Sequence, residues 1–226
     1  PLANTRIANG QVIEYTFLDQ VANSVAFSVK DSSCSFSGEA RTAVNVVSAT
    51  LFGCSGGDGP RTIRATVSSL EGTIGHGDMS YIYDGSSPTL IPSTPENTHV
   101  TANTPLAFTT SEPIQHSSTI FNATGCSFDS PSLDDLILTA NLVHCDQEGP
   151  FSLSITVVDL AGNSGMYDYR YVYDTLGPTF TPSRPENSKV KANTVLSFTA
   201  NEPIASSGLS LVASGCSLAE PTLNDS

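Results

Sequence analysis

With 226 residues and a formal net charge of −13, the chain carries an electrostatic field that repels phosphate backbones, so nucleic acid is not an expected partner. Charged residues make up only 14% of the chain while serine and threonine together number 56, so the outward faces of its strands are expected to be largely hydroxyl-bearing. No apolar run reaches the ~18 residues of a membrane span, and no membrane span is expected in this segment.

The first part of the chain is a weaker copy of a segment that lies about 90 residues later. Residues 63–67 alternate apolar and polar side chains, as a half-buried strand does, and they align with residues 153–157 at an offset of 90. Residues 8–10 correspond to residues 102–104 after small gaps. The segment matching residues 89–91 is therefore missing, and we expect this repeat to lack its first strand.

The middle of the chain has the clearest strand pattern. Residues 151–157 alternate apolar side chains with serine or threonine, and after a turn at residues 159–163 every second residue of 167–173 is tyrosine, which predicts a hairpin. Further strands are expected at residues 106–109, 119–124 and 136–143. No segment shows the 3.6-residue apolar period of a helix. Short strands and frequent turn residues predict an all-β fold of antiparallel β-sandwiches.

Four short motifs return 90 residues later, which predicts a tandem array of one small domain. They are Pro95-Glu96-Asn97, Ala102-Asn103-Thr104, Glu112-Pro113-Ile114 and Gly125-Cys126-Ser127, repeated from Pro185, Ala192, Glu202 and Gly215. The expected domains are residues 1–87, without a first strand, residues 88–177, a complete repeat, and residues 178–226, the first half of a repeat. Both ends of the sequence are expected to be cuts in a longer array.

The five cysteines follow the same repeat. Cys34 and Cys54 lie 20 residues apart and Cys126 and Cys145 lie 19 apart, so each pair is expected to form a disulfide within one repeat. Cys216 aligns with Cys126, and its partner is expected beyond the chain end; an intermolecular bridge or a free thiol is the alternative. Paired cysteines without a metal-binding spacing indicate an extracellular or cell-surface location.

A resemblance to a known family is carried by residues 155–163, which read Ile-Thr-Val-Val-Asp-Leu-Ala-Gly-Asn, and by a final strand that ends in Tyr173-Asp174 before Pro178. This pattern resembles the bacterial-type immunoglobulin-like repeats of large surface adhesins and extracellular glycoprotein fibres. The resemblance implies a seven-stranded sandwich, end-to-end stacking and a structural or adhesive role. The first repeat departs from the pattern, because residues 69–73 read Ser-Leu-Glu-Gly-Thr.

No catalytic residue is expected. Residues 53–57 match the G-x-S-x-G pattern of a hydrolase nucleophile, but Asp58-Gly59-Pro60 follows where a helix is required, and Cys54 is expected to be bridged. We interpret Ser55 as part of a glycine-rich turn. The four histidines, at positions 76, 99, 116 and 144, do not recur at the 90-residue offset and are expected in solvated loops.

Calcium is the one metal ion that the sequence suggests, because hard cations bind several carboxylate and carbonyl oxygens and can stiffen linked sandwiches. The candidate ligands are Asp159, Asp174, Glu112 and Glu202. No dense run of alternating carboxylates occurs, so solvated turn carboxylates are the favoured alternative. No other cofactor is expected.

Covalent glycans are expected, because a β-rich chain with few charges has weakly protected sheet edges. The N-glycosylation motif occurs at Asn122 and Asn224.

Repetition without a recurring active site predicts a non-enzymatic, glycosylated extracellular structural protein. Its domains are expected to form a stalk or fibre, with copies of itself or neighbouring repeats as partners. Two alternatives stay open: the spacer region of a cell-surface adhesin, and the accessory domains of a secreted hydrolase.

Overall fold

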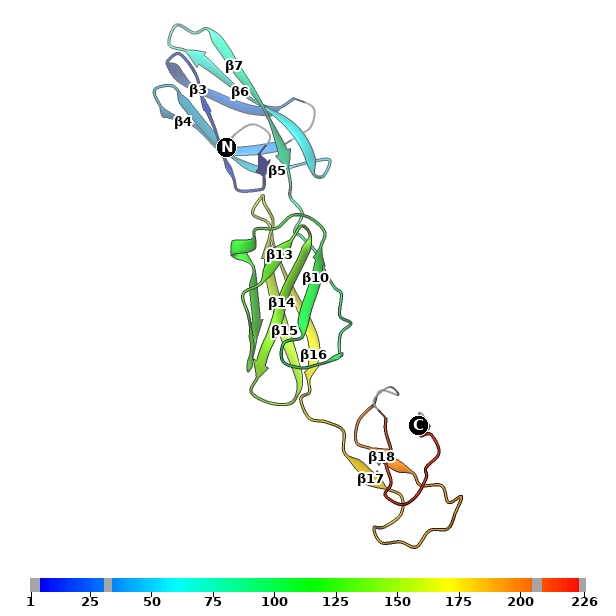
Figure 1. Cartoon of the computed structure of the whole chain (residues 1–226). Coiled ribbons are helices and arrows are strands. Elements are labelled where there is room, and N and C mark those ends of the chain that lie inside the picture. Colours follow the sequence, from blue (N-terminus) through cyan, green and yellow to red (C-terminus); the bar gives the residue numbers. More distant parts are fainter. Residues whose placement is uncertain (1–4, 31–33, 205–208, 224–226) are drawn as a thin grey trace. The chain divides into compact units, whose positions relative to one another are not determined.

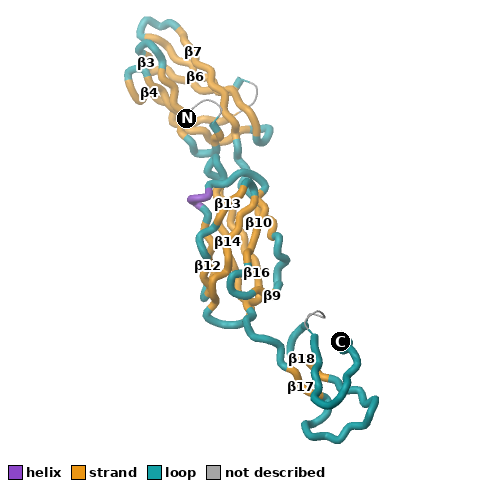
Figure 2. The backbone as a smooth tube through the Cα atoms, in the orientation of Figure 1, coloured by secondary structure: helices purple, strands orange, loops and turns teal. Residues whose placement is uncertain are grey.

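The computed structural model describes residues 5–30, 34–204 and 209–223, and these residues are built almost wholly from β-strands (Figures 1 and 2). The chain divides into two compact units, Pro1–Asp174 and Thr175–Ser226. The expected fold class is confirmed: the protein is all-β, and its strands form immunoglobulin-like antiparallel sandwiches. No helix in the described ranges is long and apolar enough to cross a membrane.

The first sandwich, within the larger unit, has seven strands. They are β1 (Arg6–Ile7), β2 (Val12–Thr16), β3 (Val21–Val29), β4 (Cys34–Ala43), β5 (Val46–Cys54), β6 (Gly59–Ser69) and β7 (Ile74–Tyr83). Two sheets form, in the orders β1-β7-β6-β3 and β2-β5-β4. Among the described residues β2 pairs with β5 alone.

The second sandwich has nine strands and one 3-10 turn, His116–Ser118. The strands are β8 (Leu90–Pro92), β9 (His99–Val100), β10 (Pro105–Thr110), β11 (Ile120–Ala123), β12 (Cys126–Phe128), β13 (Ser132–Asp134), β14 (Ile137–Cys145), β15 (Gly149–Val158) and β16 (Ser164–Tyr173). Strand β14 joins the two layers, because its first part pairs with β10 and its last part with β12. The strand number exceeds the seven that the family resemblance implies, since short segments such as β13 form strands of their own.

Each sandwich has its own hydrophobic core. The alternation along β15 places Leu153, Ile155 and Val157 in the second core with no exposed surface, as the period-two pattern predicts. Tyr81 and Tyr171, one repeat apart, are both almost fully buried in the corresponding cores. The hydrophobic effect of these two cores therefore stabilises two similar bodies, one per repeat.

The histidines do not all lie in loops. His76, His99 and His144 lie on strands β7, β9 and β14, and only His116 lies in a turn. All four side chains are exposed. The expectation of loops is wrong for three of them because outward positions of a strand reach water as readily as a loop does.

The smaller unit contains one pair of short strands, β17 (Phe180–Pro182) and β18 (Phe198–Ala200). Their register, Phe180 opposite Ala200, repeats that of β8 and β10, where Leu90 lies opposite Thr110. Many apolar side chains of this unit lie at its surface.

Candidate functional site

The turn between β15 and β16 is organised by the carboxylate of Asp159. Its Oδ1 accepts hydrogen bonds from the backbone N–H groups of Ala161, Gly162 and Asn163 at 2.7–2.9 Å. Its Oδ2 accepts one from the side-chain amide of Asn163 at 2.8 Å. Asp159 is fully buried, so these bonds replace those of water. The expectation of a solvated turn carboxylate is wrong here, because the turn folds its own amides over the carboxylate.

Asn163 also connects the two sandwiches. Its side-chain amide donates a hydrogen bond to the backbone carbonyl of Asp84 at 2.9 Å, and Asp84 follows directly after β7 of the first sandwich. The carboxylate of Asp84 is buried and accepts a hydrogen bond from the guanidinium of Arg6 at 2.5 Å. The amide of Asn163 therefore joins the end of the first sandwich to a turn of the second, while the ion pair of Arg6 with Asp84 lies within the first sandwich.

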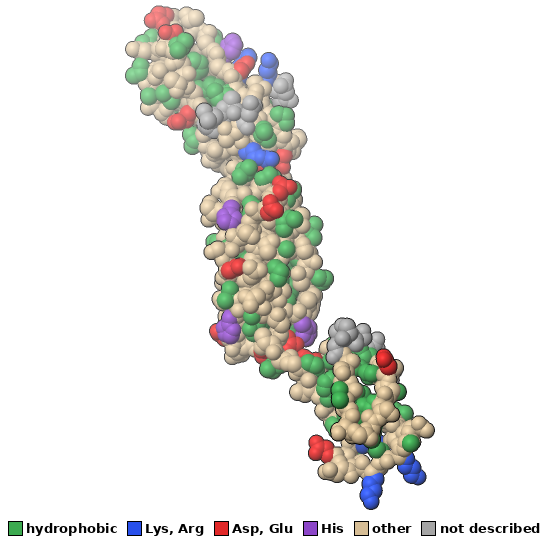
Figure 3. Space-filling model, in the orientation of Figure 1, with side chains coloured by type: hydrophobic (Ala, Val, Ile, Leu, Met, Phe, Trp, Pro, Cys, Tyr) green, Lys and Arg blue, Asp and Glu red, His purple; other side chains and the backbone are tan. Residues whose placement is uncertain are grey.

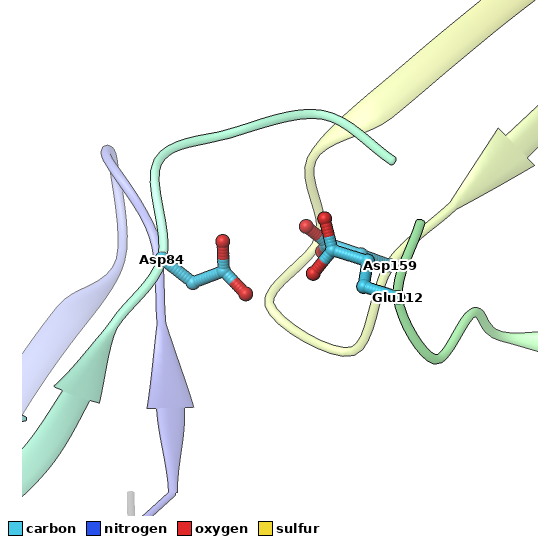
Figure 4. Close-up of side chains that lie close together, drawn as sticks. All are labelled: Asp84, Glu112 and Asp159. Carbon is cyan, nitrogen blue, oxygen red and sulfur yellow. The ribbon is translucent and has the colours of Figure 1, made fainter. Parts of the chain in front are cut away.

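A third carboxylate, that of Glu112, completes what we call the junction cluster: Asp84, Glu112 and Asp159 with Arg6 and Asn163. Carboxylate oxygens of the three acids lie within 4.8 Å of one another, and they come from three separate segments (Figure 4). Glu112 lies 3.7 Å from Arg6. Burial, followed by the negative charges of Asp84 and Asp159, raises the pKa of the Glu112 carboxyl, and Arg6 opposes this effect.

Three carboxylates at this spacing can hold a hard cation such as Ca²⁺. Of the candidate calcium ligands, Glu112 and Asp159 lie together in the cluster. Asp174 instead lies at the end of β16, with its Oδ2 at 2.9 Å from Nδ1 of His99. The guanidinium of Arg6 already supplies positive charge to the cluster, and calcium binding stays a prediction.

Sequence reasoning missed Asp84 and Arg6. The repeat points to Asp84, because Asp84 lies 90 residues before Asp174, a candidate calcium ligand. Glu112 and Glu202, two further candidates, are related by the same offset. Arg6 has no such signal, since it reaches Asp84 only through the parallel pairing of β1 with β7.

The structure contains a disulfide between Cys34 and Cys54 and another between Cys126 and Cys145, as their spacing predicts. Each joins residues directly opposite on two paired strands, β4 with β5 and β12 with β14. Cys216 has a free, exposed thiol.

The side chain of Asn122 is exposed on β11, while its neighbours Phe121 and Ala123 pack against the core. An outward position of this kind is open to a glycan, and glycosylation of Asn122 stays a prediction. Asn224 lies outside the described residues.

Ser55 lies in the turn between β5 and β6. Cys54 beside it is bridged, and a strand, β6, follows where a nucleophile elbow requires a helix. The residues around Ser55 therefore lack the local structure that would expose it as a nucleophile.

No protein-family model and no curated protein sequence matches the chain. Among solved structures, CopC from Methylosinus trichosporium OB3b is 14% identical with a TM-score of 0.33, and the match covers 38% of this chain and 93% of that one. The C-terminal domain of the Streptococcus agalactiae AgI/II polypeptide BspA is 5% identical with a TM-score of 0.32, over 76% of this chain and 96% of that one. Domains 5–6 of the S-layer protein SbsC are 10% identical with a TM-score of 0.27, over 76% and 95%. Likenesses this distant carry no argument about function.

Proposed function

We propose that this protein is a non-enzymatic extracellular structural protein whose tandem immunoglobulin-like domains form a stalk or fibre. Two disulfides support an oxidising location. The spacer of a cell-surface adhesin, or the accessory domains of a secreted hydrolase, is the alternative. A full-length sequence with a binding domain or a catalytic domain would establish one of these.

The observation that carries the proposal is the junction cluster. Its first-sandwich side contributes Asp84, and its second-sandwich side contributes Glu112 and the turn of Asp159 and Asn163. Asp84 and Glu112 recur 90 residues later as Asp174 and Glu202. The sequence thus repeats groups from both sides of a junction, as an array built by one kind of end-to-end contact requires.

The test is the length of the particle as repeats are added. Arrays of two, four and six copies of residues 88–177 are imaged by rotary-shadowed electron microscopy. Strands of about 10 residues at ~3.4 Å each predict an added length of about 35–45 Å per copy. Particles that grow in all directions, with no constant axial step, would contradict the proposal.

Glycosylation belongs to the same proposal, with Asn122 as the attachment site that the structure leaves accessible. Protein purified from its natural source should exceed the polypeptide mass, and Asn122→Gln should remove one glycan from that excess. An intact mass equal to that of the bare chain would refute it.

A further inference from the structure

The second sandwich has a groove at the place where β11 and β12 diverge. Among the described residues, these two strands pair only through Ala123 and Cys126. Beyond this pair, residues of β11 line one side of the groove and the segment 126–131 lines the other. The half-buried rings of Phe121 and Phe128 lie in the groove, with their centroids 5.8 Å apart. One edge of β11 therefore borders a partly apolar channel.

The first sandwich shows which backbone groups of β11 face the groove. Phe27 of β3 lies opposite Ala65, and Phe121 lies opposite Ile155, which is 90 residues after Ala65. The N–H of Phe27 donates a hydrogen bond to Oε1 of Glu39 on β4 at 3.0 Å, so it points away from β6. The N–H and C=O groups of one residue point to the same side of an antiparallel strand. Because the register is the same, both groups of Phe121 point away from β15 and face the groove.

The two sandwiches differ in what covers this edge. In the first, β4 is continuous, and its Glu39 accepts the hydrogen bond from Phe27. In the second, the corresponding segment is interrupted between β12 and β13, and Pro131 stands in the place of Glu39. Each of these two residues lies five positions after the first cysteine of its disulfide. A proline side chain has no acceptor atom, so the described contacts of Phe121 contain no counterpart of the bond to Glu39.

The groove lies in an acidic part of the chain. Between Arg64 and Arg170 the sequence contains no lysine or arginine. Three exposed aspartates lie on the second wall of the groove or on the β13 segment that follows it: Asp129, Asp134 and Asp135. Figure 3 shows acidic side chains along the visible face of this sandwich. Electrostatic complementarity therefore favours a basic ligand in the groove over an acidic one.

We propose that this groove binds an extended, basic segment of a partner protein, which adds to β11 as a further strand. The partner residue opposite Phe121 accepts a hydrogen bond from its N–H and donates one to its C=O. The apolar side chain of that residue points inward and packs against Phe121 and Phe128, and its basic neighbours in the segment meet the acidic surface. In strand addition of this kind, main-chain hydrogen bonds give affinity and alternate side chains give specificity. This binding activity is independent of the stalk or fibre proposed above.

The experiment is an NMR titration of the full chain with a seven-residue peptide of alternating lysine and valine. The chain is produced without glycans, because Asn122 borders the groove. We expect a saturable shift of the Phe121 amide resonance and a Kd at least tenfold lower than that of the same peptide with glutamate in place of lysine. No saturable shift at Phe121, or equal affinity for the two peptides, would overturn the proposal.

Backbone methylation of the peptide separates strand addition from simple charge attraction. In the bound strand the valines point inward, so their N–H groups face β11 and those of the lysines face water. Methylation of the valine amides should raise the Kd at least tenfold. Methylation of the lysine amides, which leaves the net charge the same, should change the Kd less than twofold. Equal effects of the two methylations would show that no strand is added.

A matched pair of variants tests the comparison with the first sandwich. Pro131→Glu supplies the carboxylate that Glu39 provides there, so it should cover the edge of β11 and raise the Kd of the lysine–valine peptide at least tenfold, although it makes the chain more negative. Pro150→Glu adds the same charge at an exposed position of β15 outside the groove and should not raise the Kd. Unchanged or tighter binding to Pro131→Glu would contradict the proposal.

Two further outcomes are decisive. Dimerisation of the full chain that Pro131→Glu abolishes would overturn the proposal, because a second copy of the chain would then occupy the groove. If Pro131→Glu does not fold, the methylated peptides decide the question on the wild-type chain.

Discussion

At the scale of single residues, the two sandwiches form the same turn with different side chains. In the first, the hydroxyl oxygen of Ser69 accepts hydrogen bonds from the backbone amides of Glu71 and Thr73 at 3.2 Å. In the second, a buried charged oxygen of Asp159 accepts three amides at shorter distances. Hydrogen bonds to a charged acceptor are roughly twice as strong as neutral ones. The second turn should therefore be the more stable of the two.

Asp159→Ala should lower the free energy of unfolding of the second sandwich by about 2–3 kcal/mol, because it leaves buried amides without their charged acceptor. Amide exchange at residues 161–163 measures the effect locally. The matched variant, Ser69→Ala, should cost about 1 kcal/mol in the first sandwich. An equal or larger effect at Ser69 would contradict this ranking.

Glu112 should make stability depend on pH. Its pKa is raised from the ordinary value of 4.5, by burial first and by Asp84 and Asp159 next, so the folded protein holds this proton more tightly than the unfolded chain. The contribution to stability is therefore full below pH 4.5 and is lost as the pH rises through the raised pKa.

Urea unfolding of wild type and Glu112→Gln across the acid range checks this sign. The free energy of unfolding of wild type minus that of the variant should fall as the pH rises from 4.5 through the raised pKa of Glu112, since the glutamine does not titrate. A difference that stays constant or increases would show that the junction cluster does not perturb Glu112.

At the scale of elements, strand β16 fastens the first segment of its own repeat through tyrosine hydroxyls. Tyr167, Tyr169 and Tyr171 donate hydrogen bonds to the backbone carbonyls of Pro88, Leu90 and Thr94 at 2.7, 2.9 and 3.3 Å. Burial raises the pKa of Tyr169 and of Tyr171 to about 12, so both hydroxyls keep the protons that they donate. The three-residue strand β8 thus has side-chain support in addition to its pairing with β10.

Tyr169→Phe should destabilise the second sandwich by about 1–1.5 kcal/mol, because the carbonyl of Leu90 loses a buried donor. Amide exchange in β8 should accelerate with it. The control is Tyr81→Phe in the first sandwich, where the hydroxyl donates to the weakly accepting sulfur of Met79 at 3.0 Å and also lies beside the hydroxyl of Tyr15. Tyr15 keeps its own hydrogen bond to the carbonyl of Ile63 in this variant, so no buried carbonyl loses a donor. A larger loss from Tyr81→Phe would remove the special role of β16.

Sequence patterns predict the long strands well and the short ones poorly. The alternation of inward and outward side chains along β15 and β16 is visible in the sequence because it continues over ten paired positions. Strands of two or three residues, such as β9 and β13, have no such signal, since they form only where a partner strand already lies. The sequence does not reveal the buried acids of the junction for a similar reason. The carboxylate of Asp84 is buried beside its partner Arg6, which lies 78 residues earlier in the chain.

At the scale of the whole molecule, we expect the junction cluster to couple the motions of the first two sandwiches. The contacts that cross from one sandwich to the other include the bond from Asn163 to Asp84 and the pairing of Arg6 with Glu112. Because these groups are buried or half-buried, salt screens them less than it screens surface pairs.

Replacing both Arg6 and Asn163 by alanine should let the two sandwiches reorient independently. NMR relaxation should then give a shorter rotational correlation time for each sandwich, with its core chemical shifts retained. Arg64→Ala is the control, since its ion pair with Asp78, at 2.6 Å, lies between neighbouring strands of the first sandwich. Unchanged relaxation in the double variant would show that other contacts hold the junction.

The position of the disulfides limits how far each sandwich can stretch under load. When tension is applied through the chain ends, the bridge between Cys126 and Cys145 carries the force past the 19-residue segment that it closes. At ~3.4 Å per residue, that segment withholds about 65 Å of extension until the bridge is reduced. The maximum extension of each bridged repeat is therefore shorter in an oxidising medium than in a reducing one. A chain of such repeats outside the cell would extend less under load than its number of residues suggests.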